Sequence, residues 1–279
     1  MLPTFTDHQL QQAFTRDGYV TVPLLEPAEV AELLGLWRSL RARPDQPFLS
    51  TVLDEEKDQF VVVHEALRDR CRTRLDDLFD DHRLVLGHII DKRPVDPISD
   101  AGTVPVHQDL TAVDETEARS AFVWCPLVDA VGLRAPLAVV PGSHLLSLAP
   151  RGSGSLPWIL EPLAVRLQDR LIEVPVTAGT AIVYDGALVH ASRPNHSGLD
   201  RPVVGLGLIP DRAPLLRYHG TASGRVECFE VEPEYLLHGA QTLRPEVGVT
   251  SVREVAWTWT TPFDDPLVGG AGHPSGGRS

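Results

Sequence analysis

Short apolar segments separated by glycine and proline run through the middle of the chain, and they limit the fold more than any other feature. Segments with the length and apolar density of β-strands are residues 84–90, 121–127, 137–140, 171–176, 180–184 and 203–209. Ala178-Gly179 is a turn signal, which predicts that the strands on either side of it pair. Helical patterns do not alternate with these strands, so an α/β fold is disfavoured. The pattern favours a jelly-roll core.

Helical patterns precede these strands. The sequence predicts a first helix with Thr6 as its N-cap, Gln9 completing a capping box and Gly18 as a left-handed C-cap. A short strand at residues 19–22 follows. Pro27 then opens a second helix, marked by a stripe of apolar residues on one face. The prediction is a mainly β fold with flanking α-helices.

Two further segments precede the first long strand. The apolar run at residues 60–63 reads as another strand, and residues 67–78 read as a third helix. One face of that helix carries Arg68, Arg70, Arg72 and Arg74. Such a run is usually a solvated face, and the alternative is a docking surface for a phosphopantetheine arm or a carrier protein.

A histidine and an aspartate two residues apart are candidates for metal ligands. Side chains at i and i+2 of a β-strand point to the same face, so His107 and Asp109 would converge on one point. His190, from a later strand, would add a second imidazole. Two histidines and one carboxylate form the facial triad that binds Fe(II) and leaves positions open. A His-x-Asp pair alone is weak evidence, because many such pairs are exposed loop residues.

Arg201 follows His190 by eleven residues and would hold a carboxylate through two parallel hydrogen bonds. The ordered set of segments is more specific than any one residue. It consists of Pro105-Val106-His107-Gln108-Asp109, Val139-Val140-Pro141-Gly142-Ser143-His144, His190-Ala191-Ser192-Arg193-Pro194-Asn195 and Arg201. This set resembles the phytanoyl-CoA dioxygenase family of Fe(II)/2-oxoglutarate oxygenases, and the resemblance extends from about residue 6 to about residue 210.

The resemblance implies a double-stranded β-helix (a cupin-like jelly roll), with Fe(II), 2-oxoglutarate and O₂ as cofactor and cosubstrates. It implies His107, Asp109 and His190 as catalytic metal ligands and Arg201 as the residue that binds 2-oxoglutarate. Gln108 and Trp124 occupy positions where the family often contacts 2-oxoglutarate. Ser192 lies two residues past His190 and would share its face on a strand, so its hydroxyl would assist at the same distal carboxylate. Gln108 would point away from the metal on a regular strand, and Trp124 would serve equally well in the core. The family's lysine or histidine contact from an earlier strand has two candidates, His88 and Lys92.

The retained carboxylate of Asp109 favours hydroxylation over halogenation, since halogenating relatives carry a small residue there. Desaturation, ring closure and epimerisation remain alternatives to hydroxylation. The expected substrate is a small organic molecule, free or tethered to CoA or a carrier protein, in natural-product biosynthesis. Two other functions remain open: a non-catalytic jelly-roll binding protein with a relic metal site, and a zinc hydrolase that uses the same ligands.

Composition narrows the partners. The chain of 279 residues has a net charge of −13, which argues against nucleic acid and anionic membranes. Cys71, Cys125 and Cys228 are too few and too widely spaced for a disulfide framework or a zinc ribbon, and no leader segment or apolar run of membrane-spanning length is evident. A cytoplasmic enzyme is therefore expected. We expect one domain over residues 1–265 and a disordered tail over residues 266–279. The oligomeric state is not indicated.

Overall fold

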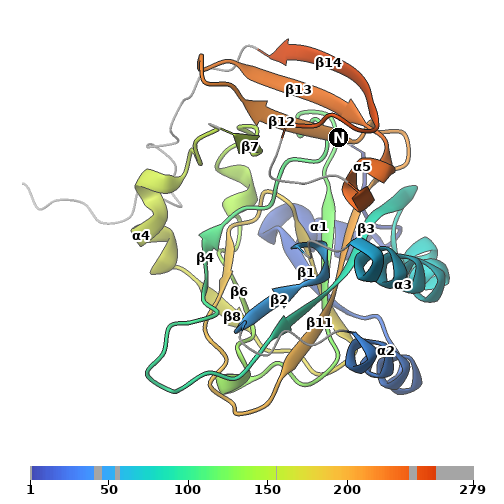
Figure 1. Cartoon of the computed structure of the whole chain (residues 1–279), viewed down its shortest axis with the longest axis vertical. Helices are drawn as coiled ribbons and strands as arrows, with labels where there is room; N and C mark the ends of the chain where they lie inside the picture. The colour runs from blue at the N-terminus through green and yellow to red at the C-terminus, as the bar shows by residue number, and fades with distance from the viewer. Residues whose placement is uncertain (1, 41–45, 54–56, 155, 239–243, 256–279) are drawn as a thin grey trace, which may run out of the picture.

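The computed structural model describes residues 2–40, 46–53, 57–154, 156–238 and 244–255. Two antiparallel sheets, of six and four strands, form the barrel, and a third sheet lies across one end of it (Figure 1). This is the predicted mainly β fold with flanking helices. Helices α2 and α3 cover the larger sheet on one side of the molecule, while α4 lies on the opposite side (Figure 1).

The larger sheet has the strand order β1-β9-β5-β11-β3-β2, and all its pairs are antiparallel. Its strands are β1 (Tyr19–Pro23), β2 (Phe48–Ser50), β3 (His82–Lys92), β5 (Ala121–Pro126), β9 (Thr180–Asp185) and β11 (Arg201–Pro210). Strand β11 lies between β3 and β5, so residues from these three strands form the continuous floor of the barrel.

The other two sheets have four strands each. The smaller barrel sheet contains β4 (Val104–His107), β10 (His190–Ser192), β6 (Leu137–Val139) and β8 (Ile172–Val174), in that order. The third sheet contains β14 (Val249–Val255), β13 (Val226–Val231), β12 (Leu216–Gly220) and β7 (Ser153–Gly154). The third sheet packs on the barrel through Phe229 and Val231, which are buried beside Val85 and Ile209.

The helices are α1 (His8–Asp17), α2 (Pro27–Ser39), α3 (Lys57–Leu78), α4 (Ala164–Gln168) and α5 (Pro233–His238). Short 3₁₀ turns lie at Thr51–Leu53, Gly132–Arg134, Ser143–Leu145 and Glu161–Leu163. Gly18 ends α1 with a φ of 80°, as predicted. The predicted N-cap is wrong: the Asp7 carboxylate accepts from the backbone N–H groups of Gln9 and Leu10, and Thr6 instead donates to the Asp77 carbonyl.

The predicted strand at residues 60–63 is also wrong, because those residues lie inside α3. Their apolar side chains continue the helical spacing of the next turns, and the buried residues of this stripe are Phe60, Val63, Leu67, Cys71 and Leu75. A run of four apolar residues fits either period, and the helix prevails because it buries all five side chains on one face. On the exposed face of α3, Arg70 and Arg74 pair with carboxylates of α2.

Alternation along β11 separates the two faces of the larger sheet. Val204, Leu206 and Leu208 face the helices and join the core formed with α1, α2 and α3. Val203 faces the other way and packs with Trp124 and residues of the smaller sheet. The inner face therefore holds the side chains that surround the barrel interior.

The strands at 171–176 and 180–184 exist, as β8 and β9, but their predicted pairing is wrong. Strand β8 pairs with β6, whereas β9 pairs with β1 and β5 in the opposite sheet. The turn at Ala178-Gly179 therefore carries the chain from one sheet to the other. The predicted domain boundary at residue 265 and the predicted tail lie outside the described residues. Among the described helices, none has the length and apolarity needed to cross a membrane.

Candidate active site

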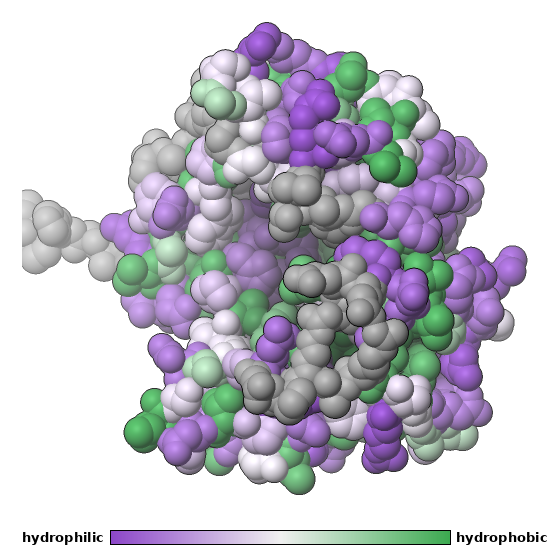
Figure 2. Space-filling model, in the orientation of Figure 1, coloured by the Kyte–Doolittle hydropathy of each residue, from purple (hydrophilic) through white to green (hydrophobic). Residues whose placement is uncertain are grey.

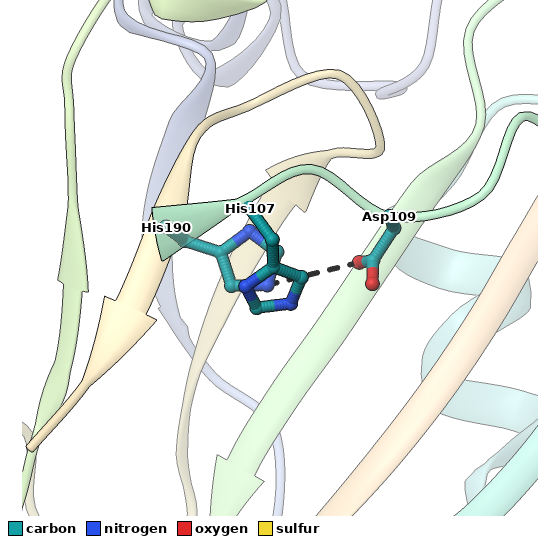
Figure 3. Close-up of side chains that lie close together, drawn as sticks. All are labelled: His107, Asp109 and His190. Atoms are coloured by element: carbon teal, nitrogen blue, oxygen red, sulfur yellow. Dashed lines mark ion pairs between the residues drawn. The ribbon is translucent and has the colours of Figure 1, made fainter. Parts of the chain in front are cut away.

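His107, Asp109 and His190 meet inside the barrel, and one ligand atom from each lies within 4.8 Å of the others (Figure 3). His107 ends β4 and His190 begins β10, and the two are direct partners across the antiparallel pair. Their ring centroids are 4.1 Å apart. Asp109 lies just beyond the strand, where its backbone N–H donates to the Gly186 carbonyl at 3.1 Å. The three ligands predicted from the sequence therefore converge.

Both imidazoles present Nε2 to the centre of this group. The Nδ1 atom of His107 donates to the Pro105 carbonyl at 2.8 Å, and that of His190 donates to the Leu188 carbonyl at 2.9 Å. A carbonyl oxygen can only accept, so each Nδ1 carries a proton, and in the neutral form of each ring Nε2 keeps its lone pair. Burial, and then the adjacent His107, lowers the pKa of His190 to about 4. Neutral imidazoles are the form that binds a metal.

Asp109 is held from two sides. The Tyr184 hydroxyl donates to Asp109 Oδ2 at 3.0 Å, which leaves Oδ1 without this constraint. Burial, and then the Asp109 charge, raises the pKa of Tyr184 well above its usual value, so the phenol remains a donor. The Arg151 Nε donates to the Asp109 backbone carbonyl at 2.7 Å, and Arg151 itself pairs with buried Glu115. The carboxylate is thus oriented before any metal binds.

Sequence reasoning missed Tyr184, although a signal was available. It lies on the predicted strand 180–184, six residues before His190, and it projects to the inner face that also carries Ile182. Period-2 alternation would place Tyr184 on the same face as Ile182, but it does not reveal that the segment after β4 brings Asp109 within reach of the hydroxyl.

A cavity of about 280 Å³ opens from the metal ligands. Its apolar walls come from Phe48, Val52, Leu53, Leu86, Ile90, Val104, Leu110, Phe122 and Leu137. His88, Trp124, Ser192, Arg201 and Arg217 add polar groups to the lining. The face of the molecule shown in Figure 2 is hollowed near its centre. The mixture of apolar walls and few polar groups is typical of a small-molecule site.

Arg201 lies at one end of this cavity, with only 1% of its surface exposed. Its guanidinium donates to the Ala135 carbonyl and lies 5.0 Å from the centre of the Trp124 ring. Its Nε is buried and has no hydrogen-bond partner in the described part of the chain. Burial lowers the pKa of Arg201 to about 9, so the group stays cationic at neutral pH. A buried cation with an unused donor fits a carboxylate ligand.

Lys92 and Ser192 close this end. Lys92 lies directly opposite Arg201 across β3 and β11, and its Nζ donates to the Ser192 hydroxyl and to the Arg193 carbonyl, the latter at 2.7 Å. Burial, and then the neighbouring Arg201, lowers the pKa of Lys92 to about 6. Within the described residues, the hydrogen bonds of its amine are all to Ser192 and Arg193, so Lys92 fixes the turn after β10. Lys92 is one of the two candidates for the family's lysine or histidine contact to 2-oxoglutarate, and its amine is already bound to Ser192 and Arg193.

His88 is the other of those two, and it lines the cavity. Its Nδ1 forms a hydrogen bond of 2.9 Å with the Ser50 hydroxyl. The ring lies over Gly205, where an added Cβ would be 2.2 Å from His88 Nε2. Burial lowers the pKa of His88 to about 4, so the imidazole is neutral. Glycine at 205 is thus what allows the His88 imidazole to lie on the floor of the cavity.

Gln108 does not line the cavity. Its amide nitrogen donates to the Ala187 carbonyl at 2.6 Å, and its amide oxygen accepts from the Trp158 indole at 3.0 Å. Both ends of the amide are therefore used in tying the loop that contains Trp158 to the barrel. This geometry does not support the prediction that Gln108 contacts 2-oxoglutarate, because both ends of the amide are bound within the protein.

These residues fit iron and 2-oxoglutarate. Three ligands with oriented lone pairs leave positions open on a metal, and a buried arginine with a free donor lies in the same cavity. A model of the family described as phytanoyl-CoA dioxygenase (PhyH) matches residues 14–203. The chain belongs to this family. Its members use Fe(II), 2-oxoglutarate and O₂ on small molecules, which confirms the predicted cofactors. The matched residues include Arg201 but end before Arg217.

Solved structures share the fold. EvdO2 from Micromonospora carbonacea var. aurantiaca is 20% identical, with a TM-score of 0.52 over 75% of this chain and 93% of its own. HygX from Streptomyces hygroscopicus, with nickel and 2-oxoglutarate bound, is 18% identical, with a TM-score of 0.52 over 74% and 88%. The epimerase SnoN, in complex with Fe³⁺, alpha ketoglutarate and nogalamycin RO, is 22% identical, with a TM-score of 0.52 over 74% and 84%. No curated protein sequence matches significantly.

Proposed function

We propose that this protein is a dioxygenase that hydroxylates an unactivated C–H bond of a small organic substrate. The observation that carries the proposal is the shared cavity: a two-histidine, one-aspartate ligand set and a buried arginine with an unpartnered Nε face the same space. When bound, iron and 2-oxoglutarate supply the oxidising power, with 2-oxoglutarate leaving as succinate and CO₂.

The protein's own residues would bind the metal and 2-oxoglutarate, orient them, and exclude water from the site. His107, Asp109 and His190 would hold the metal, with Tyr184 and two backbone carbonyls fixing their orientation. Arg201 would pair with the distal carboxylate of 2-oxoglutarate, with the Trp124 ring against its guanidinium. The apolar walls keep the reacting C–H bond away from water.

The retained carboxylate supports hydroxylation over halogenation, because Asp109 fills the position where a halide would need room. Desaturation, ring closure and epimerisation use the same ligand set, and SnoN is an epimerase. A role in natural-product biosynthesis is supported by neighbours such as SnoN, which was solved with nogalamycin RO. A substrate tethered to CoA or a carrier protein and a cytoplasmic location remain predictions.

The test is an anaerobic titration of the protein with Fe(II) and 2-oxoglutarate, monitored through the visible charge-transfer band of the chelate. The wild-type protein should develop the band, His107→Ala should not, and Arg201→Ala should need more 2-oxoglutarate. Iron binding without a band in the wild-type protein would refute the assignment. The relic binding protein or the zinc hydrolase would then be the better description.

A further inference from the structure

Arg217 is a second buried arginine in the cavity, and neither the family match nor the reaction uses it. It lies on β12, its surface is 8% exposed, and its guanidinium lines the same space as His107, Asp109 and Arg201. Its Nε is buried and unpartnered. Its side chain forms no hydrogen bond or ion pair with any residue that the structure describes. A buried guanidinium without a partner is costly, so its retention calls for a ligand.

The position of Arg217 separates it from Arg201. Arg217 also lines a small adjoining cavity with Leu86, Phe122 and Gly207. In the sheet, Gly207 lies opposite Leu86 and Phe122, whereas Arg201 lies opposite Lys92. Six residues of β11 separate positions 201 and 207, which corresponds to roughly 20 Å of strand. The two arginines thus enter the cavity from opposite ends of the floor, and His88, opposite Gly205, lies between these two positions along the sheet.

The electrostatic neighbours of Arg217 do not neutralise it. The groups that raise its pKa are Tyr235 and Asp109, while burial, the larger effect, lowers it. Asp109 forms no ion pair with Arg217 within 4.0 Å, and its carboxylate already accepts from Tyr184 and faces the metal position. The charge of Arg217 therefore remains available at the end of the cavity remote from Arg201.

We propose that Arg217 binds a carboxylate of the substrate, which makes the substrate a small organic acid with an apolar body. The inference rests on the proposed function, in which 2-oxoglutarate occupies Arg201 and leaves Arg217 to the substrate. One guanidinium balances one negative charge and presents two parallel donors to a carboxylate. Leu86 and Phe122 beside it favour hydrocarbon next to that group. Held there, the acid would place its chain between Arg217 and the metal.

The experiment uses monocarboxylic acids of three to ten carbons, including 3-phenylpropionate, each paired with its neutral amide. Binding is followed through perturbation of the anaerobic Fe(II)/2-oxoglutarate band and, independently, through the rise in melting temperature of the protein without metal. Phenyl phosphate is included as the alternative oxyanion. The variants are Arg217→Met and, as a matched control, Arg225→Met, because Arg225 is exposed and pairs with Glu254 outside the cavity.

Acids should bind better than their amides, Arg217→Met should weaken acid binding by about tenfold or more, and Arg225→Met should not change it. Arg217→Met should melt at the wild-type temperature or above, since an unpaired buried cation is removed. Equal binding of acids and amides, acid binding retained in Arg217→Met, or no response to any acid would overturn the proposal. So would a lower melting temperature of Arg217→Met, tighter binding of phenyl phosphate, or a raised 2-oxoglutarate requirement. A missing band with intact acid-induced stabilisation would refute the proposed function alone.

Discussion

The Arg201 end of the cavity is built from long, regular strands, whereas the Arg217 end is built from the third sheet and its loops. Arg201 lies within β11, flanked by β3 and β5, and its surroundings are closed by Trp124 and by Lys92 bound to Ser192. Arg217 comes from β12, beyond the last residue of the family match. The end that suits the shared cosubstrate thus belongs to the shared fold, and the other end belongs to the part of the chain that the family model does not match.

This difference suggests how one fold serves several reactions. Strand pairing fixes the positions of His107, His190 and Arg201, the residues proposed to hold the metal and the cosubstrate. Among the described residues, the third sheet contributes Arg217 to the same space, and on our proposal a change there would alter the substrate without disturbing the metal. The following variants test this division, from the largest expected effect to the smallest.

His107, Asp109 and His190 line the same cavity as both arginines, so loss of one of these proposed metal ligands should have the largest effect on iron binding and turnover. We expect His190→Ala to lower the affinity for Fe(II) by more than about a hundredfold, because ligand loss exceeds the effect of changing a supporting residue. Measured iron content and 2-oxoglutarate turnover would report the change. His144→Ala is the control, since His144 is buried but hydrogen-bonds to the Thr15 carbonyl away from the site. Iron binding unchanged in His190→Ala would remove it from the ligand set.

The floor between the two ends should be sensitive to a single methyl group. In Gly205→Ala the new Cβ would be 2.2 Å from His88 Nε2, so the ring or the strand must shift. We expect a loss of about 1–3 kcal/mol in the free energy of unfolding, together with weaker 2-oxoglutarate binding. Denaturant unfolding measures the first and band titration the second. Gly35→Ala, in α2 with no atom within 4 Å of the new Cβ, should be neutral or stabilising.

Tyr184→Phe tests the support of Asp109. The change removes the hydrogen bond to Asp109 Oδ2 and keeps the ring, so we expect about a tenfold loss in iron affinity with little change in melting temperature. Competition with a chelator would measure it. Tyr19→Phe, on β1, should leave iron affinity unchanged. An unchanged affinity in Tyr184→Phe would mean that the backbone alone orients the carboxylate.

The variant with the smallest expected effect on binding in the cavity changes Asp91, which lies on β3 behind the Arg201 end. Burial raises the pKa of Asp91 from 3.8 to about 6. Between these values the folded protein holds a proton that the unfolded chain has released, so stability should fall as the pH rises through this window. Asp91→Asn should remove this slope, so that its stability relative to wild type improves by about 2 kcal/mol between pH 4 and pH 7. Parallel slopes in both proteins would show that Asp91 titrates normally.

The sequence predicts the convergence of His107, Asp109 and His190 well because most of its geometry is local. The His107 and Asp109 pair depends on a two-residue spacing, and His190 on the pairing of one strand with another. Ser192, expected on the same face as His190, and Trp124, at a position that often contacts 2-oxoglutarate in the family, also line the cavity.

The features that the sequence does not predict are those that depend on which sheet each strand joins. The β8 and β9 strands were recognised, but their turn gives no sign that the chain crosses between sheets. Arg217 had a signal, since a cation between Leu216 and Tyr218 in an apolar strand is unusual. Its meaning required the packing of the third sheet against the barrel, which involves residues far apart in the chain. The start of α3 was missed because four apolar residues fit both periods.

The most direct test of the division between the two ends is a pair of anaerobic 2-oxoglutarate titrations of the iron-loaded protein, one on Arg201→Met and one on Arg217→Met. We expect the first variant to need about ten to a hundred times more 2-oxoglutarate than wild type to develop the charge-transfer band. The second variant should match wild type. A raised requirement in both variants, or in Arg217→Met alone, would contradict the assignment of one anion to each end.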